Sequence, residues 1–150
     1  MKKILFSTLL LVATFANALN IGDATPTFEI KDQFDKKHKI AADTKTILVA
    51  ADKDTSTILK EYFLAKDANF LTANKAYYVA DISGMPSLIA KFFALPKMKD
   101  YPFSVLLVDE EQTKSFTKKE DNITVYTVTD GKISDIKYVK DAAGLDSVFK

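Results

Sequence analysis

The sequence contains no cysteine among its 150 residues. This absence excludes thiol–disulfide catalysis, a peroxidatic cysteine and iron–sulfur ligation. Arginine is absent too, because lysine supplies all 21 basic residues. Without arginine the chain has no bidentate phosphate ligand, and 21 basic residues against 20 acidic ones give no basic excess to attract nucleic acid. We therefore expect no nucleic-acid partner.

Catalytic and metal-binding signatures are also missing. The chain has no His-x-x-Glu-His motif, no Gly-rich phosphate loop and no Gly-x-Ser-x-Gly elbow. The single histidine, His38, lies in a lysine-rich segment, which predicts an exposed turn residue rather than a general base. Asp81, Asp109 and Asp130 each end an apolar run, and we expect solvated strand termini there. The sequence thus predicts no cofactor and no metal site.

The first 18 residues predict a secretory signal peptide. Lys2 and Lys3 precede an apolar stretch over residues 4–15, and Ala16-Asn17-Ala18 supplies the small residues of a cleavage site. A membrane anchor is the alternative, but the apolar stretch is shorter than the ~20 residues that a spanning helix needs. We therefore expect cleavage after Ala18, export to the periplasm and no membrane span in the mature chain.

The mature chain, residues 19–150, has the length of one domain. Such a domain buries roughly two-thirds of the surface that its unfolded chain exposes, so it needs neither a disulfide nor a metal for stability. Once Lys2 and Lys3 are removed, 19 of the 21 basic residues remain against 20 acidic ones. We expect this nearly neutral domain to be a monomer or a weak dimer.

Segments of strand length alternate with segments of helical spacing along the mature chain. Residues 46–51 form an almost wholly apolar run, typical of a buried strand, and Leu59, Tyr62 and Phe63 follow at helical spacing. Strands are predicted at residues 28–30, 38–40, 46–51, 76–82, 103–108, 123–128 and 133–139, and helices at residues 55–64, 86–95 and 141–149, with one helical turn near residues 113–116. This order predicts an α/β fold: a central mixed sheet with helices on both faces and an N-terminal hairpin.

The predicted helix at residues 86–95, which Pro96 is expected to end, has a wide apolar face. That face would suit a membrane surface or a protein partner. A helix that crosses a sheet must nevertheless be apolar on its inner side, so we expect it to pack in the core. Because helix neighbours differ by about a third of a turn, Phe92 and Phe93 cannot both point inward. An exposed phenylalanine here would mark an interaction surface.

Polar residues gather where the central helix is predicted to begin. Asp52, Asp54, Thr55 and Ser56 could hold a small cation through carboxylates, or an anion through unpaired helix N–H groups. The simpler interpretation is a helix cap in which Asp54 or Thr55 accepts an N–H bond, worth ~1 kcal/mol. Calcium would need more oxygen ligands than Asp52 and Asp54 supply. We favour the cap and keep the ligand site as the alternative.

Several short motifs carry a family resemblance. Gly22-Asp23, Pro26 and Phe28 match the Gly, acid, Pro, x, Phe entry motif of TlpA-type and peroxiredoxin-type proteins. Together with the order of elements, they make the chain resemble the thioredoxin-like superfamily. It is more similar still to the exported, cysteine-free YtfJ type, which shares Asp32-Gln33-Phe34, the segment from Tyr101-Pro102 to Asp109, and Asp130-Gly131-Lys132-Ile133.

The resemblance implies a thioredoxin-like fold whose redox site is lost. The Cys-x-x-Cys position at the helix start reads Thr55-Ser56-Thr57-Ile58, and the cis-proline position on the facing strand reads Asn122. Oxidoreductase activity is therefore excluded. The binding residues implied at this place are Asp52, Asp54, Thr55, Ser56 and Asn122.

Two functional hypotheses follow from this lost site. The first is an exported, redox-inactive thioredoxin-fold domain that binds a protein or peptide partner or acts as an accessory module. The alternative is a non-thiol enzyme or a small-ligand-binding protein that uses the helix start at residues 52–56; a purely structural role is the third. An exposed apolar patch would favour the first, and a closed pocket with convergent polar groups would favour the second.

Asn122 also belongs to an Asn-x-Thr acceptor sequence. The segment Glu120-Asp121-Asn122-Ile123-Thr124 includes the acidic residue two positions earlier that bacterial N-glycosylation prefers. The polar residues before it predict an accessible loop, whereas a position at the entry of a strand would order the backbone. Short motifs of this kind also match often by chance. Glycosylation of Asn122 is therefore a minority hypothesis.

Overall fold

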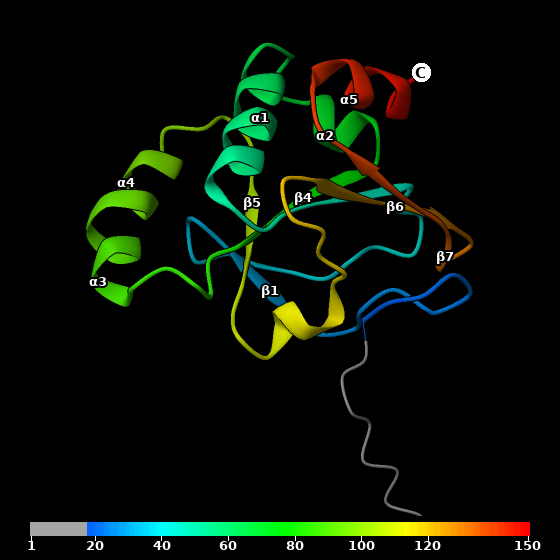
Figure 1. Cartoon of the computed structure of the whole chain (residues 1–150), viewed down its shortest axis with the longest axis horizontal. Coiled ribbons are helices and arrows are strands. Elements are labelled where there is room, and N and C mark those ends of the chain that lie inside the picture. Colours follow the sequence, from blue (N-terminus) through cyan, green and yellow to red (C-terminus); the bar gives the residue numbers. More distant parts are fainter. Residues whose placement is uncertain (1–17) are drawn as a thin grey trace, which may run out of the picture.

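The computed structural model describes residues 18–150, and within this range the chain forms one sheet of seven strands (Figure 1). The predicted signal peptide lies outside the described residues, Ala18 excepted. The strands are β1 (Ile30–Asp32), β2 (Lys37–His38), β3 (Thr46–Ala50), β4 (Ala76–Asp81), β5 (Val105–Val108), β6 (Ile123–Thr129) and β7 (Lys132–Val139). The helices are α1 (Lys53–Leu64), α2 (Phe70–Ala73), α3 (Ser87–Ile89), the π-helix η1 (Ala90–Ala94), α4 (Leu95–Met98), the 3-10 helix η2 (Gln112–Ser115) and α5 (Ala142–Val148).

The centre of the sheet is parallel and its margins are antiparallel. The strand order is β2-β1-β5-β4-β3-β6-β7; β4 pairs in parallel with both β3 and β5, whereas β6 and β1 run antiparallel to their inner neighbours. All five residues of β3 are buried, because this strand has a neighbour on each side and cover on each face. The predicted mixed sheet and the parallel β3–β4 pair are confirmed.

Helices α1, α2 and α5 cover one face of the sheet (Figure 1). Three side chains of α1 point into this core: Leu59, Tyr62 and Phe63 are 0%, 8% and 1% exposed. The ring centroid of Phe63 lies 5.9 Å from that of Tyr78 and 5.9 Å from that of Phe103, spacings at which aromatic rings attract one another. This packing fixes α1 against the sheet and thereby fixes where the helix begins.

The opposite face is covered by the leading segment and by η2. Leu19 and Phe116 are buried there, and Phe28 packs against the same cluster. The backbone N–H of Leu19 donates to the Ser115 carbonyl at 2.8 Å, which joins the two covering segments. The predicted helical turn near residues 113–116 is confirmed, and it is the only helix in the described residues that packs on this face.

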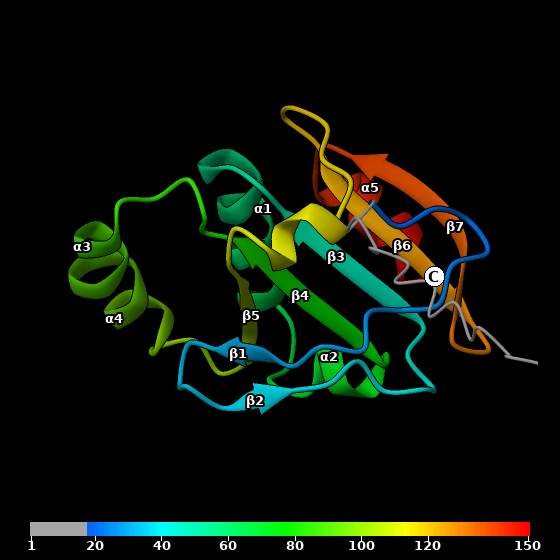
Figure 2. The same cartoon turned by 90° about the horizontal axis from the view of Figure 1, so that it is seen from below.

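Residues 82–99, which we call the arm, connect β4 to β5 through α3, η1 and α4. Figures 1 and 2 both show the arm to one side of the sheet rather than across it. Leu88, Phe92 and Phe93 are 69%, 61% and 62% exposed, so the expectation that this helix packs in the core is wrong. The physical reason is that the right-handed crossover from β4 to β5 falls on the same face as the crossover from β3 to β4, and α1, α2 and α5 already cover that face.

Pro96 does not end the arm helix, contrary to expectation. The helix continues to Met98, and the wide π-helical turn η1 lies directly before the proline. Proline lacks an N–H donor and its ring crowds the carbonyl four residues earlier, here that of Phe92. A π-helical turn beside the proline is a recognised way in which a helix accommodates such a disruption.

Two hairpins close the margins of the sheet. The predicted turn at the C-terminal hairpin is confirmed: Asp130 and Gly131 have φ of 53° and 76°, the left-handed values that a tight Asp-Gly turn requires. In the N-terminal hairpin, His38 Nε2 lies 2.6 Å from Oδ2 of the buried Asp32, so His38 is a half-buried strand residue and not an exposed turn residue. Burial alone would raise the pKa of Asp32, but its hydrogen bonds with His38, Phe34 and Lys36 lower the pKa below the ordinary 3.8.

Candidate functional site

An open cleft of about 660 Å³ separates the start of α1 from the arm. One wall comes from the end of β3 and the first two turns of α1, and the other comes from α3, η1 and α4. The cleft lies at the carboxyl ends of the parallel strands β3 and β4, where α/β folds place their binding groups. Its lining includes two residues of the predicted site, Asp52 and Ser56.

The wall of the cleft on the α1 side is built on the helix cap of α1. Asp52 is the N-cap: its Oδ1 accepts the Thr55 backbone N–H at 2.8 Å and the Thr55 hydroxyl at 2.8 Å. The Thr55 hydroxyl is also near the Asp52 N–H, at 3.4 Å, which completes a capping box. The expectation that Asp54 or Thr55 is the cap is therefore wrong by two or three positions. The helix begins earlier because Lys53 and Asp54 already follow the helical path.

Only some of the five predicted site residues face the cleft. Asp52 and Ser56 line the cleft, Thr55 is 1% exposed beneath the cap, and Asp54 is exposed but does not line the cleft. Asn122 lies directly before β6, whose register with β3 places it beside the start of α1. Its side chain is 5% exposed and its amide donates to the Glu120 carbonyl at 2.8 Å. Asn122 thus supports the loop and does not face the cleft.

An ion pair between a buried carboxylate and an exposed lysine lies at the base of the cleft. Asp81, the last residue of β4, has a side chain that is 5% exposed and pairs with Lys118. Its Oδ1 accepts the Ser83 N–H at 2.9 Å and the Ser83 hydroxyl at 2.6 Å. Burial alone would raise the pKa of Asp81, but the bonds to Lys118 and Ser83 outweigh burial and lower the pKa below 3.8. Asp81 is therefore not a solvated strand terminus; it anchors the first residues of the arm.

The arm wall of the cleft is apolar. Ile89 and Phe93, one helical turn apart, line it together with Met85, Ala94 and Met98. Ile89 is 46% exposed and Phe93 is 62% exposed, so both present apolar surface to whatever enters the cleft. Phe92, in contrast, does not line the cleft although it is equally exposed. The two neighbouring phenylalanines therefore occupy different faces of the arm.

Positive charge borders the cleft. Lys53 and Lys60 of α1 and Lys97 of α4 are part of its lining, whereas its two lining carboxylates, Asp52 and Asp81, are engaged in the cap and in the Lys118 pair. At the floor, the Tyr78 hydroxyl donates to the Ser56 carbonyl at 3.2 Å, and burial raises the pKa of Tyr78. The cleft thus combines an apolar wall, a neutral floor and a basic rim.

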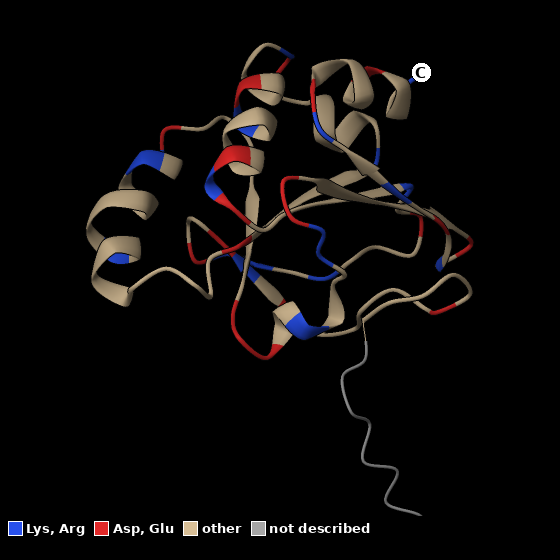
Figure 3. Ribbon diagram, in the orientation of Figure 1, with Lys and Arg blue, Asp and Glu red and all other residues tan. Residues whose placement is uncertain are grey.

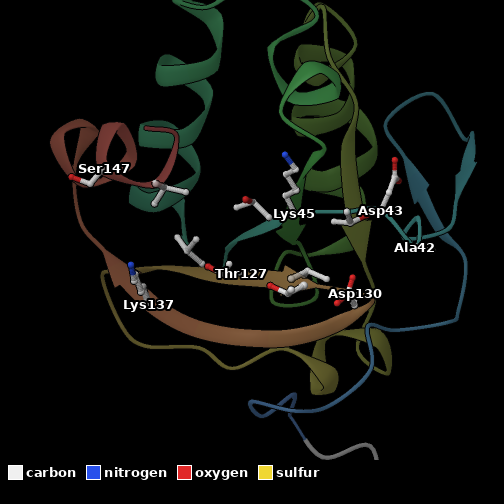
Figure 4. A pocket seen from close by; sticks show the side chains of 13 residues that line it. Ala42, Asp43, Lys45, Thr127, Asp130, Lys137 and Ser147 are labelled. Atoms are coloured by element: carbon white, nitrogen blue, oxygen red, sulfur yellow. The ribbon is translucent and has the colours of Figure 1, made fainter.

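A second, slightly larger cavity of about 720 Å³ lies at the other end of β3 (Figure 4). Its labelled residues come from the loop before β3, from the β6–β7 hairpin and from α5, among them Lys45, Thr127 and Lys137 (Figure 4). Asp43 at its edge pairs with Lys75 at 3.2 Å, and Lys137 pairs with Asp135 at 3.6 Å. This cavity is remote from the carboxyl ends of the strands, where α/β folds place their binding groups. We therefore regard the cleft at α1 as the candidate site.

No protein-family model matches the chain, and no curated protein matches it by sequence. Solved structures do match. Peroxidoxin BcpB from Mycobacterium tuberculosis is 17% identical with a TM-score of 0.55, over 87% of this chain and 94% of that one. A thio-disulfide isomerase from Thermus thermophilus is 18% identical with a TM-score of 0.52, over 87% and 95%. StoA from Bacillus subtilis is 11% identical with a TM-score of 0.56, over 83% and 100%.

These likenesses, all at low identity, concern the fold. The chain has a thioredoxin-like fold, as its sequence predicted, and it contains no cysteine with which to perform thiol chemistry. Of the five site residues that the sequence suggested, Asp52 and Ser56 line the cleft. The sequence did not place the arm beside them. It did single out Phe92 and Phe93, which no single core can bury together, as the mark of an interaction surface.

Proposed function

We propose that this chain is an exported, redox-inactive thioredoxin-fold module that binds an extended polypeptide segment in the cleft between α1 and the arm. In this proposal the position that carries a redox motif in thiol-active relatives has become a docking surface. The partner contributes an apolar side chain to the arm wall and carboxylates to the basic rim. No covalent step is involved.

The observation that carries this proposal is the exposed apolar wall at the site of the lost motif. Ile89 and Phe93 face an open cleft at 46% and 62% exposure, next to Met85 and Met98. Methionine is flexible and polarisable, so it adapts to differently shaped side chains. A wall of this kind favours binding of varied apolar residues rather than recognition of one small molecule.

The charges of the cleft support an acidic partner. Lys53, Lys60 and Lys97 line it, while Asp52 and Asp81 are satisfied internally. An incoming carboxylate meets ammonium groups without first displacing a carboxylate. Charge complementarity of this type steers association and fixes which segments bind.

The rival hypothesis, a small-ligand site or non-thiol enzyme at residues 52–56, is less well supported. One oxygen of the Asp52 carboxylate, Oδ1, already accepts two bonds from Thr55 at 2.8 Å each, which holds the carboxylate in the helix cap. The cleft is open rather than closed. In residues 18–150 no cluster of three or more His, Cys, Asp or Glu side chains is arranged for a metal.

The test uses a fluorescein-labelled peptide in which Leu and Phe alternate with Glu, and follows binding to residues 19–150 by fluorescence anisotropy. We expect saturable binding that weakens as salt is added. Phe93→Ser removes an apolar contact and should weaken binding about tenfold. Phe92→Ser is the matched control, because this neighbour is equally exposed but does not line the cleft, and it should leave peptide affinity unchanged.

Two results would contradict the proposal: no saturable binding, or an equal loss of affinity in both variants. A peptide with Lys in place of Glu checks the charge argument, since it should bind less well than the acidic peptide. The proposed export has its own test. Cell fractionation followed by N-terminal sequencing should find a periplasmic chain that starts at Leu19.

A further inference from the structure

The outer side of the arm carries a second apolar surface that the cleft does not use. We call Leu88, Lys91, Phe92, Leu95 and Lys99 the ridge; none of them lines the cleft. Leu88 is 69% exposed and Phe92 is 61% exposed, more than any core position and far more than folding requires. Helical spacing brings these residues onto one side of the arm, turn after turn.

The charged residues of the ridge and of the rest of the arm are all basic, and the exposed Asp100 follows directly after Lys99. The 18 residues 82–99 contain Lys91, Lys97 and Lys99 and no acidic residue. In Figure 3 the ribbon of α3 and α4 carries blue and no red. Among the described residues, no carboxylate forms an ion pair with any of these three lysines. Exposed apolar side chains and uncompensated positive charge therefore occupy the same short helix.

The arm is also the part of the fold that stands away from the body. Figures 1 and 2 show α3 and α4 beside the sheet from two perpendicular directions. Within residues 18–150, neither hydrophobic core includes a residue of the arm. The ridge is consequently a protruding edge, able to meet a flat surface without hindrance from the rest of the domain.

We propose that the ridge docks on an anionic lipid surface. Leu88 and Phe92 enter the boundary between headgroups and acyl chains, while the ammonium groups of Lys91 and Lys99 remain at the level of the lipid phosphates. Short helices with Phe and Leu on one side and Lys beside them bind membrane interfaces in this way. Lysine acts there as a point charge that needs no fixed geometry, which suits a fluid surface.

Other occupants fit the ridge less well. A second copy of this chain would bring Lys91 and Lys99 of one ridge against the same lysines of the other, and like charges across an interface repel. A specific protein partner is usually oriented by hydrogen bonds. From Leu88 to Lys99, however, the segment has no uncharged polar side chain to supply them.

The experiment measures flotation of residues 19–150 with unilamellar vesicles. This range contains every described helix and strand and omits the leading apolar stretch, which would itself bind lipid. Binding is expected to vesicles that contain phosphatidylglycerol, to be weak with phosphatidylcholine alone, and to fall as salt is raised. Phe92→Ser should lower the partition coefficient about tenfold. Lys91→Gln with Lys99→Gln should lower it roughly thirtyfold.

Ile21→Ser is the control, because Ile21 is 64% exposed in the leading segment, where the neighbouring Gly22 N–H donates to the Ile133 carbonyl of β7 at the margin of the sheet opposite to β2. It should leave vesicle binding unchanged. Equal binding to both lipids, or no difference between Phe92→Ser and Ile21→Ser, would overturn the proposal. So would a concentration-dependent dimer in sedimentation that Phe92→Ser abolishes, since the ridge would then be a self-association surface. Peptide binding in the cleft, which depends on Phe93, is read independently of each of these outcomes.

Discussion

Helix α1 and the arm have similar apolar side chains and opposite surroundings. In α1, Leu59 and Phe63 are 0% and 1% exposed; in the arm, Leu88 and Phe92 are 69% and 61% exposed. Both helices show apolar residues at helical spacing in the sequence. The difference comes from the rest of the chain: α1 packs on the sheet together with α2 and α5, whereas the arm, whose crossover falls on the same face, lies beside these helices.

The comparison teaches that periodicity identifies the side of a helix that is apolar, not what covers it. Exposed apolar surface of this extent on a helix is a marker of interaction rather than of folding. Binding and stability should therefore be separable in this protein. Substitutions in α1 should affect folding, and substitutions in the arm should affect binding.

The largest expected effect comes from the same substitution made in both helices. Phe63→Ala removes a ring packed against Tyr78 and Phe103 and should lower the free energy of unfolding by about 3–5 kcal/mol. Phe92→Ala and Phe93→Ala should each change it by less than about 0.5 kcal/mol. Urea unfolding of the three variants measures this. A loss above 2 kcal/mol in either arm variant would mean that the arm packs against the body.

A second substitution tests the junction between arm and body. The buried Gln33 side chain donates to the Phe103 carbonyl at 2.7 Å and to the Met98 carbonyl at 3.2 Å, and it accepts the Val105 N–H at 2.8 Å. Gln33→Ala leaves buried backbone groups unpaired and should cost about 2–3 kcal/mol. Gln112→Ala, which removes the exposed side-chain bonds to the Asp109 N–H and the Glu29 carbonyl, should cost less than about 1 kcal/mol. Equal costs would show that Gln33 is not the tie between arm and sheet.

Acid should weaken the point where the arm leaves the sheet. The pKa values of Asp81 and Asp32 are lowered in the folded state, so each contributes stability that is present above the unfolded pKa near 3.8 and is lost as pH falls through the lower folded pKa. We expect the free energy of unfolding to decline below pH ~4. In Asp81→Asn the decline should be shallower, although stability at neutral pH is lower because Lys118 loses its partner. Urea unfolding of the wild type and of Asp81→Asn across this pH range measures both effects. If the free energy of unfolding declines equally with pH in the two proteins, the role of Asp81 is refuted.

Removal of the N-cap side chain of α1 should have a smaller effect on the free energy of unfolding. Asp52→Ala removes the side chain that accepts the Thr55 N–H and should lower the free energy of unfolding by about 1 kcal/mol. Asp54→Ala, two positions further on, should change it by less than about 0.5 kcal/mol. Thermal unfolding of the two variants separates these positions. If Asp54→Ala is the more destabilising, the helix begins later than the cap geometry indicates.

The smallest expected effect concerns the acceptor sequence at Asn122. In the folded domain the Asn122 side chain is 5% exposed, and the Thr124 hydroxyl donates to the Thr117 carbonyl at 2.8 Å. The two side chains of the acceptor sequence, Asn122 and Thr124, are thus hydrogen-bonded within the folded domain. A glycan would therefore have to be added before β6 joins the sheet. Intact-mass measurement on protein from the native host should give the unmodified mass. A glycan-sized increment that Asn122→Gln abolishes would establish the modification instead.

The sequence predicted the body of the fold well because its signals are local. The buried run of β3, the Asp-Gly turn at Asp130 and the apolar face of α1 each follow from a few neighbouring residues. The arm was mispredicted because its position depends on competition for one face of the sheet with segments distant in sequence, Leu71 of α2 and Leu145 of α5 among them. His38 was misjudged for the same reason, since its partner Asp32 lies across a hairpin.

Neither hydrophobic core includes a residue of the arm, so the sequence of the arm can vary more freely in evolution than that of the sheet. Apart from the buried Ala90, substitutions in residues 82–99 face little selection through folding, provided that the anchors at Asp81 and Gln33 remain. The segment can therefore drift, lengthen or be replaced while the seven-stranded sheet stays intact. A thioredoxin-like domain without cysteine keeps in this way a region free to acquire new specificities. In protein engineering, the same segment is the natural place to graft a foreign recognition helix.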